Sequence, residues 1–289
     1  MKAPKFNYIK AKSRHQALEL LDSLGDEGRI IAGGQSLMPT LNMRLSQPDT
    51  LIDINQIPDL QRIAVENDIV KIGALCRHAD IAQSPIINEH LSLISQAMYH
   101  VAHVAVRNRG TIGGSIALAD PAAELPACAV ALGATLAVES INGRREIAAE
   151  DFFKGLYETA RQSNELLVEI MIPREKSDDV SVFMELAQRH GDFAIAGLAC
   201  LARVKNKSFE KLRLVYFGSE DKPTLARKTA DAVIGKTWSE KRRAAAIDAL
   251  ADDLDPMENL QGSASMKLHL QKVLTGRVLD TVIDRGGIE

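Results

Sequence analysis

The chain has 289 residues, of which 46% are hydrophobic and 25% are charged, as in ordinary soluble globular proteins. A chain of this length buries about three quarters of its surface on folding, so its stability requires neither disulfides nor a structural metal. Its 35 basic and 38 acidic side chains give a net charge of −3, and aromatic residues make up 4%. Nucleic-acid-binding proteins normally carry a basic excess and aromatic stacking surfaces, so this composition argues against that class.

The three cysteines, Cys76, Cys128 and Cys200, are far apart in the sequence and include no CxxC pair. This spacing excludes an iron–sulfur cluster or a zinc ribbon held by this chain alone. An odd number of thiols also fits a reducing compartment better than a disulfide framework. The N-terminus lacks the apolar core of a signal peptide, and no apolar run reaches the length of a membrane span. We therefore expect a cytoplasmic protein with no transmembrane segment.

Helix and strand patterns alternate along the first two-thirds of the chain. A short amphipathic helix is predicted to start at an N-cap, Ser13, and to stop at Gly25. Strands are predicted over residues 29–31, 51–57 and 69–75, where β-branched or alternating apolar residues gather.

A second helix is expected over residues 90–104, before a stretch rich in glycine. Residues 134–140 and 143–147 are separated by Asn-Gly, the strongest short hairpin signal, and so predict a β-hairpin. Residues 166–173 then read as a strand. The charged, apolar-poor segment after this strand predicts a domain boundary near residue 176.

The boundary divides the chain into a first domain, residues 1–176, with a possible subdivision near residue 57, and a second domain, residues 177–289. In the second domain two strands, joined by a hairpin around residues 205–208, come before the helices. The strands are predicted over residues 192–204 and 211–219, and the helices over 226–234, 240–250 and 263–283. Strands followed by helices are typical of an α+β fold.

Two loops contain adjacent glycines: the first glycine loop, residues 32–37, and the second glycine loop, residues 109–115. Adjacent glycines let a ligand approach the backbone closely and let N–H groups converge on an anion. Ser36 and Ser115 add a hydroxyl to each loop. Two such loops in one domain would suit a diphosphate, and the alternative is that both are only tight turns.

One feature of a Rossmann fingerprint is present, because Asp53 lies 20 positions after Gly33, the usual offset of the ribose-binding acid. However, the loop lacks the GxGxxG spacing, and Pro39 occupies a position where the helix should be under way. The pattern therefore does not support a parallel nucleotide-binding sheet.

The segments IAGGQSLMPTLNMR with LIDINQI, and RNRGTIGGSIALADPAAELPACAVALGA, resemble the two flavin-binding motifs of the molybdenum hydroxylase flavoprotein subunit. NELLVEIMIP, QRHGDFAIAGLA and SASMKLHLQKVLTGRVL are similar to later segments of the same family, in the same order. The family includes the medium subunit of aerobic carbon monoxide dehydrogenase and the flavin domain of xanthine dehydrogenase. This resemblance implies an α+β fold with a two-part FAD-binding domain of the vanillyl-alcohol-oxidase (PCMH) type, followed by a smaller C-terminal α+β domain of sheet plus helices.

The resemblance also implies which residues bind FAD, and it implies no catalytic side chain and no metal ligand in this chain. The implied cofactor-binding residues are Ala32, Gly33, Gly34, Gln35, Ser36, Leu37, Thr111, Gly113, Gly114, Ser115, Glu124, Leu167, Asp192 and Phe193. Glu124 would hold the adenosine side, where relatives commonly have Asp, and Leu167 would contact the flavin region. Phe193 would be the aromatic neighbour of the isoalloxazine ring. Neither glycine loop contains His or Cys, so the FAD is expected to be non-covalent.

Three further features, a histidine pair, one aspartate and a basic cluster, have simple structural explanations. His100 and His103 lack Cys or carboxylate neighbours, so packing is favoured over metal ligation. Asp120 precedes a proline, as in many turns, although the family resemblance also allows a flavin-related role. The basic cluster 241–243 is most simply a solvated helix face, with partner docking as the alternative.

The implied function is that of an FAD-binding electron-transfer subunit of a heteromeric molybdenum hydroxylase or dehydrogenase, an oxidoreductase. The implied partners are a small subunit with [2Fe–2S] clusters and a large subunit with the molybdenum cofactor, assembled as a dimer of heterotrimers. Two alternatives stay open: a self-sufficient FAD-dependent oxidoreductase, and a non-catalytic nucleotide-binding scaffold. One Trp and four Tyr poorly supply the aromatic cap that the first alternative needs. The sequence names neither the substrate nor the electron acceptor.

Overall fold

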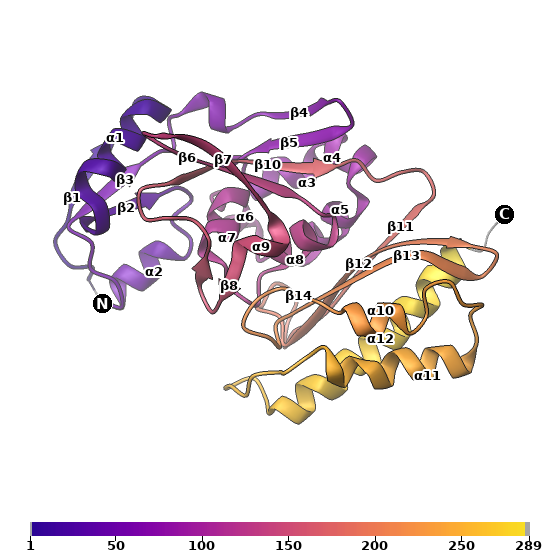
Figure 1. The fold of residues 1–289 in the computed structure, drawn as a ribbon. Helices are drawn as coiled ribbons and strands as arrows, with labels where there is room; N and C mark the ends of the chain where they lie inside the picture. Colours follow the sequence, from indigo (N-terminus) through magenta and orange to yellow (C-terminus); the bar gives the residue numbers. More distant parts are fainter. Residues whose placement is uncertain (1, 287–289) are drawn as a thin grey trace.

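The N-terminal part of the chain is a small sheet packed against one helix (Figure 1), in a computed structural model that describes residues 2–286. The strands, in the order β1-β3-β2, are β1 (Asn7–Lys10), β3 (Thr50–Asp53) and β2 (Gly28–Ile31). Helix α1 (Arg14–Leu24) begins after Ser13, whose hydroxyl accepts the Gln16 N–H at 3.1 Å. It ends at Gly25, which has a φ of 51°. The cap and the stop predicted for this helix are confirmed.

This sheet corrects one expectation, because its strands are parallel although the GxGxxG pattern is missing. Both β1 and β2 pair with β3 in parallel, and the predicted strand at 51–57 ends at Asp53. The first glycine loop directly follows β2 and so lies at the carboxyl end of the sheet. The GxGxxG fingerprint reports how a dinucleotide binds at a helix N-terminus. The direction of the strands depends instead on the connection through α1, which lets β2 run parallel to β1. Absence of the motif therefore did not exclude a parallel sheet.

The middle of the chain forms a five-stranded antiparallel sheet, with a layer of short helices on one face (Figure 1). In sheet order the strands are β4 (Ile63–Glu66), β5 (Ile69–Gly73), β10 (Leu166–Pro173), β6 (Thr135–Ser140) and β7 (Gly143–Ala148). The helices are α3 (His78–Gln83), α4 (Pro85–His90), α5 (Ser92–His100), α6 (Val104–Arg107), α7 (Ile112–Leu118), α8 (Glu124–Ala131) and α9 (Ala149–Phe152). The predicted Asn-Gly hairpin is confirmed as β6–β7, in which Ser140 pairs with Gly143. The largest apolar core lies between this sheet and its helices and continues into the C-terminal part of the chain through residues such as Phe183 and Phe217.

The helix predicted over residues 90–104 is interrupted. Helix α5 ends at His100, Ala102 adopts a φ of 42°, and α6 starts only at Val104. The Arg107 guanidinium donates to the carbonyls of Val101 and Ala102, each at 2.8 Å, and so satisfies backbone groups that the break exposes. A side chain from the next helix, rather than a Gly or Pro in the break, therefore stabilises this turn.

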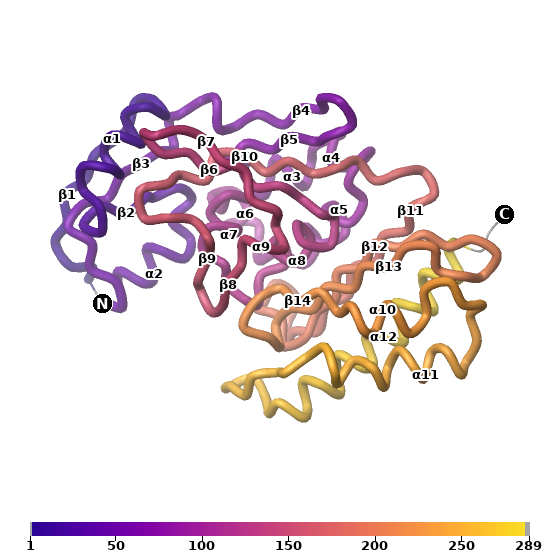
Figure 2. Tube along the Cα trace, viewed as in Figure 1, coloured from indigo at the N-terminus to yellow at the C-terminus, as the bar shows by residue number. Residues whose placement is uncertain are grey.

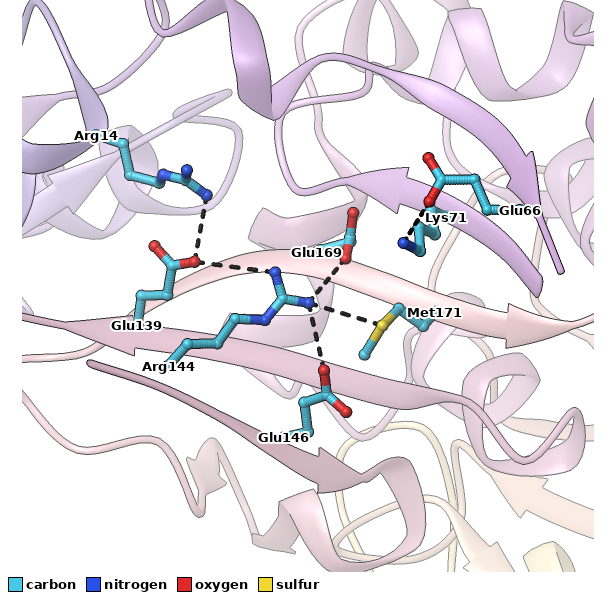
Figure 3. Close-up of polar contacts among 8 residues, drawn as sticks. All are labelled: Arg14, Glu66, Lys71, Glu139, Arg144, Glu146, Glu169 and Met171. Carbon is cyan, nitrogen blue, oxygen red and sulfur yellow. Dashed lines mark hydrogen bonds and ion pairs between the residues drawn. The ribbon is translucent and has the colours of Figure 1, made fainter.

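The outer face of the five-stranded sheet carries a network of charged side chains (Figure 3). Arg144 of β7 donates to Glu169 at 2.9 Å and to Glu146 at 3.4 Å. It also lies 3.9 Å from Glu139, which in turn pairs with Arg14 of α1 at 3.2 Å. Exposed ion pairs contribute only about 0.2–1 kcal/mol each. The network therefore matters mainly because it connects α1 to the second sheet.

The C-terminal part is a four-stranded antiparallel sheet with three helices (Figures 1 and 2). The strands are β11 (Asp179–Leu186), β12 (Ala196–Lys205), β13 (Ser208–Phe217) and β14 (Thr224–Leu225), and the helices are α10 (Arg227–Asp231), α11 (Glu240–Ala249) and α12 (Ala264–Gly286). The predicted order of strands before helices is confirmed, but β12 begins at Ala196 instead of residue 192. Strand β11 was not predicted. Helix α12 packs on one face of this sheet, and α5 and α8 pack on the other.

Helix α12 presents a buried polar stripe to the sheet. Lys267, Gln271 and Thr275 are spaced four residues apart, so they share one face of the helix, and each is fully buried. Lys267 donates to the Gly218 carbonyl at 3.3 Å, and Thr275 hydrogen-bonds Tyr216 at 2.7 Å. These contacts fix the position of α12 along the strand. Within residues 2–286, no helix combines the length and apolar character needed to cross a membrane.

Candidate functional site

The first glycine loop connects β2 to helix α2 (Leu37–Asn42) and offers free backbone N–H groups. Gly34 has a φ of 69°, a left-handed conformation that residues with a side chain disfavour. The amides of Gly33, Gly34, Gln35 and Ser36 donate to no protein atom within residues 2–286. Unpaired N–H groups on a tight loop form a concavity that binds anions.

The second glycine loop uses its amides differently. Gly113 N–H donates to the Ala74 carbonyl at 2.9 Å, and Gly114 N–H donates to the Thr111 hydroxyl at 3.1 Å. These bonds cap helix α7 and tie it to the end of β5. The half-buried Ser115 hydroxyl has no partner within residues 2–286, so it is the group that this loop offers to a ligand. Free N–H groups are therefore concentrated in the first loop.

The two loops touch each other through their backbones. A Cβ placed on Gly33 would collide with the Arg109 carbonyl oxygen and lie 2.8 Å from the Gly110 Cα. Similarly, a Cβ on Gly113 would lie 2.6 Å from the Ala74 carbonyl oxygen. Close packing within the protein, and not only the approach of a ligand, thus requires glycine at both positions.

A pair of polar side chains, Asn55 and Arg77, braces the two loops. Arg77 donates through Nη2 to Asn55 Oδ1 at 2.6 Å and through Nη1 to the Arg109 carbonyl. Asn55 Nδ2 donates to the Ala32 carbonyl at 2.7 Å. Neither residue belongs to a motif that is recognisable in the sequence. The available signal was that each is polar and lies a few residues beyond the end of a strand, Asn55 after β3 and Arg77 after β5.

Asp53 supports this brace from behind. Its Oδ1 accepts the backbone N–H of Asn55 at 2.8 Å, and its Oδ2 accepts the Tyr8 hydroxyl. Burial raises the pKa of Asp53, but the hydrogen bonds from Tyr8 and Asn55 outweigh it and lower that pKa overall. Burial, and then the nearby Arg109, lower the pKa of Arg77. The site therefore holds a second cation close to Arg77, which suits an anionic ligand.

Buried carboxyl groups lie beyond the second loop. Glu124 is the first residue of α8, and burial raises its pKa to about 7. Glu185 on β11 was not singled out from the sequence. Burial, and then the charge of Glu124, raise the pKa of Glu185 to about 8. Asp120 accepts the Tyr157 hydroxyl at 3.4 Å, and burial raises its pKa. Near neutral pH Glu124 and Glu185 can carry protons and act as donors.

The other implied FAD residues lie on two further elements. Leu167 is buried in β10, and α7 packs on that strand. Asp192 and Phe193 belong to the loop between β11 and β12, and the Phe193 side chain is 63% exposed. No hydrogen bond or ring contact within residues 2–286 joins Phe193 to either glycine loop. The structure therefore brings the two glycine loops together and leaves Phe193 apart from them.

The loop that carries Phe193 rests on the end of α5. The His190 ring packs edge-on against Tyr99 with centroids 4.7 Å apart, and a Cβ on Gly191 would lie 2.9 Å from the His103 ring. The His100 ring lies 5.2 Å from Phe183, and burial, then His190, lower its pKa. Both histidines flagged in the sequence thus take part in packing.

Two protein-family models match this chain. The "FAD binding domain in molybdopterin dehydrogenase" matches residues 4–175, and the "CO dehydrogenase flavoprotein C-terminal domain" matches residues 181–282. Among relatives, the 6-hydroxypseudooxynicotine dehydrogenase complex subunit alpha of Paenarthrobacter nicotinovorans is 37% identical, over 99% of this chain and 97% of its own length. The carbon monoxide dehydrogenase medium chain of Hydrogenophaga pseudoflava is 36% identical, over 96% of each chain.

Solved structures agree with these matches. The carbon monoxide dehydrogenase from Hydrogenophaga pseudoflava, in a form that lacks the Mo-pyranopterin moiety of its cofactor, contains a similar chain with a TM-score of 0.96 and 36% identity. Quinoline 2-oxidoreductase from Pseudomonas putida 86 gives a TM-score of 0.93 at 34% identity. Each likeness covers 99% of both chains.

Proposed function

The chain belongs to the family of FAD-binding medium subunits of molybdenum hydroxylase-type dehydrogenases, and from that premise we propose that it transfers electrons within a heteromeric complex. As such a subunit it is part of an oxidoreductase, with FAD as its cofactor. In our proposal, electrons come from [2Fe–2S] clusters of a small subunit, and the molybdenum site of a large subunit oxidises the substrate. The assembly is a cytoplasmic dimer of heterotrimers.

The free amides of the first glycine loop are the observation that carries this proposal. The N–H groups of Gly33 to Ser36, together with the Ser115 hydroxyl, would hold the FAD diphosphate. Arg77 and Arg109 supply positive charge beside them. When bound, FAD accepts electrons singly or in pairs, so it suits a position between one-electron clusters and a two-electron acceptor.

The remaining residues of the proposed site surround the rest of the cofactor. Glu124, which carries a proton in part of the molecules near neutral pH, would donate a hydrogen bond on the adenosine side. Leu167 would contact the flavin region. The exposed Phe193 ring, with Asp192 beside it, would pack next to the isoalloxazine. We also propose residues 1–176, subdivided near residue 57, and residues 177–289 as the two domains.

The cysteines argue for a subunit that depends on partners for its other redox centres. All three thiols are buried, and burial raises the pKa of Cys76 to about 12. Neutral, isolated thiols cannot ligate a cluster, which needs about four thiolates. In our proposal, the clusters that supply the electrons therefore lie on another chain.

The test uses the purified complex and the separate full-length chain. Acid precipitation of the complex should release free FAD, and adding substrate should reduce clusters and flavin together. The separate chain with FAD should accept electrons from dithionite but not from substrate. Flavin reduction by substrate in this chain alone would favour a self-sufficient oxidoreductase. A chain that takes up no FAD at all would favour a nucleotide-binding scaffold.

A further inference from the structure

Helices α11 and α12 lie on the side of the C-terminal domain that faces away from the FAD-binding domain (Figure 1), and side chains of both helices line an open groove. The groove has a volume of about 370 Å³. Its lining residues are Arg243, Ile247, His269, Lys272, Val273 and Arg277. None of them contributes to the proposed FAD site, and Arg243 belongs to the basic cluster noted in the sequence.

Arg243 is held firmly across the two helices. Its guanidinium lies over Gly276 of α12, where a Cβ would be 2.9 Å from Cζ. Its Nε is 2.9 Å from Asp280, and its Nη1 is 3.7 Å from Glu240. Arg243 thus joins α11 to α12, and these two carboxylates largely neutralise its charge.

The other two strong cations of the groove have no such partners. Neither Lys272 nor Arg277 forms an ion pair with a carboxylate in residues 2–286. His269 lies beside them on α12. The chain as a whole has a net charge of −3, so this local positive excess differs from the rest of the molecule.

Between these cations the groove is apolar. Ile247 and Val273 are half-buried and face the recess, and almost all of the surface that lines it is apolar. A small inorganic anion could pair with Lys272 and Arg277, but it would leave the apolar surface of Ile247 and Val273 uncovered. Binding to a flat anionic membrane would bring the rest of the chain, which is negatively charged overall, close to the negative lipid surface, and the two would repel each other. An apolar side chain flanked by carboxylates complements both the apolar centre of the groove and the unpaired cations beside it.

We propose that this groove docks an acidic segment, with one apolar side chain at its centre, from another subunit of the same complex. The proposal rests on the heteromeric assembly proposed above. The apolar side chain covers Ile247 and Val273, while its neighbouring carboxylates pair with Lys272 and Arg277. The groove lies on the far side of the sheet from α8, so this contact leaves the FAD site open.

Dissociation of the assembled complex on dilution tests this docking. The double variant Lys272→Gln/Arg277→Gln removes both unpaired charges and keeps good helix formers in α12. The control, Lys12→Gln/Lys205→Gln, removes two exposed, unpaired charges elsewhere. We expect the groove variant to dissociate at about tenfold higher protein concentration than the control, as measured by mass photometry. This difference should shrink as salt is added.

Hydrogen exchange on the wild-type protein gives a second readout that requires no variant. Residues 240–247 and 269–277 should exchange more slowly in the complex than in the separate chain. Equal dissociation of the two double variants, or unchanged exchange in these segments, overturns the docking site while the proposed function stands. A wild-type chain that forms no complex overturns both.

Discussion

Arg77 and Asn55 come from different sheets, and a hydrogen bond of 2.6 Å from Arg77 Nη2 to Asn55 Oδ1 joins them. Asn55 follows β3 of the parallel sheet, whereas Arg77 follows β5 of the antiparallel sheet. The first glycine loop follows β2 of the parallel sheet, and the second, between α6 and α7, is tied to the end of β5 by the Gly113 N–H. This side-chain pair, together with the backbone contact of Gly33 with residues 109 and 110, therefore fixes how close the two surfaces lie that would enclose the FAD diphosphate.

Replacing Arg77 with Met should weaken FAD binding. The change removes donors to Asn55 and to the Arg109 carbonyl, and hydrogen bonds of a charged group contribute about 1.5–3 kcal/mol each. We expect the Kd for FAD, measured by fluorescence, to rise about tenfold or more. Arg77→Lys should be intermediate, because it keeps the charge but not the forked geometry.

The matched control for this experiment is Arg62→Met, since the Arg62 side chain is 75% exposed. The melting temperature of the FAD-free protein is measured alongside. A positioning role predicts a larger effect on the Kd than on stability. A melting temperature that falls while FAD affinity stays at the wild-type value would contradict that role.

The glycines of the two loops should respond unequally to Ala. Gly33→Ala places a Cβ against the Arg109 carbonyl oxygen, a backbone atom that cannot move without separating the loops. Gly114→Ala meets only the Thr111 hydroxyl, at 2.8 Å. We expect Gly33→Ala to be purified with little FAD and Gly114→Ala to retain more of it. Flavin absorbance per mole of protein measures this, and the reverse order would refute the loop contact.

The stability of the FAD-free protein should fall as the pH rises above about 5, in part because of Glu185. Its pKa is raised from 4.5 to about 8 in the folded state, so folding favours the protonated form. That contribution is complete below the unfolded pKa and is lost as the pH rises through about 8. Glu185→Gln should remove the free-energy cost of ionising this carboxyl group in the folded protein. After allowance for partial exposure, we expect about 1 kcal/mol of stabilisation at pH 8.5 and little change at pH 5.

Thermal unfolding of the wild type and of Glu185→Gln from pH 5 to pH 9 checks this expectation. Glu124→Gln should act in the same direction, because burial raises the pKa of Glu124 as well. Parallel pH profiles for all three proteins would show that neither carboxyl changes its pKa on folding.

Removing one or the other partner of the buried Tyr216–Thr275 hydrogen bond should lower the free energy of unfolding by different amounts. Tyr216→Phe removes one hydroxyl, but the Thr275 hydroxyl still donates to the Gln271 carbonyl at 2.7 Å. Thr275→Val instead leaves the Tyr216 hydroxyl buried without its partner. We expect a loss of about 1 kcal/mol for Tyr216→Phe and about 1–3 kcal/mol for Thr275→Val. Urea unfolding measures both, and equal losses would contradict this account.

Local signals in the sequence predicted the elements that are stabilised locally. Ser13 and Gly25 delimit α1 through their own cap geometry, and the Asn-Gly hairpin depends only on its turn. Strand β11 was missed because it begins in the charged segment and lacks clean alternation. The break at Ala102 was missed because Arg107, and no local Gly or Pro, stabilises it.

The candidate site was predictable only where one segment carries it. The glycine loops are contiguous motifs and could be recognised from the sequence. The Asn55–Arg77 brace could not, because it exists only when the ends of β3 and β5 meet. Glu185 was likewise indistinguishable from a surface residue until β11 brought it near Glu124. The missing information concerned which strand ends become neighbours.

The buried stripe of α12 has a consequence for how the chain matures during translation. The Gly218 carbonyl and the Tyr216 hydroxyl find their partners in residues that are synthesised 49 and 59 positions later, respectively. Until Lys267 and Thr275 have left the ribosome, the face of the four-stranded sheet on which α12 packs lacks this helix. A premature stop codon between β13 and α12 would therefore release a polypeptide with an uncovered apolar surface that quality-control proteases recognise.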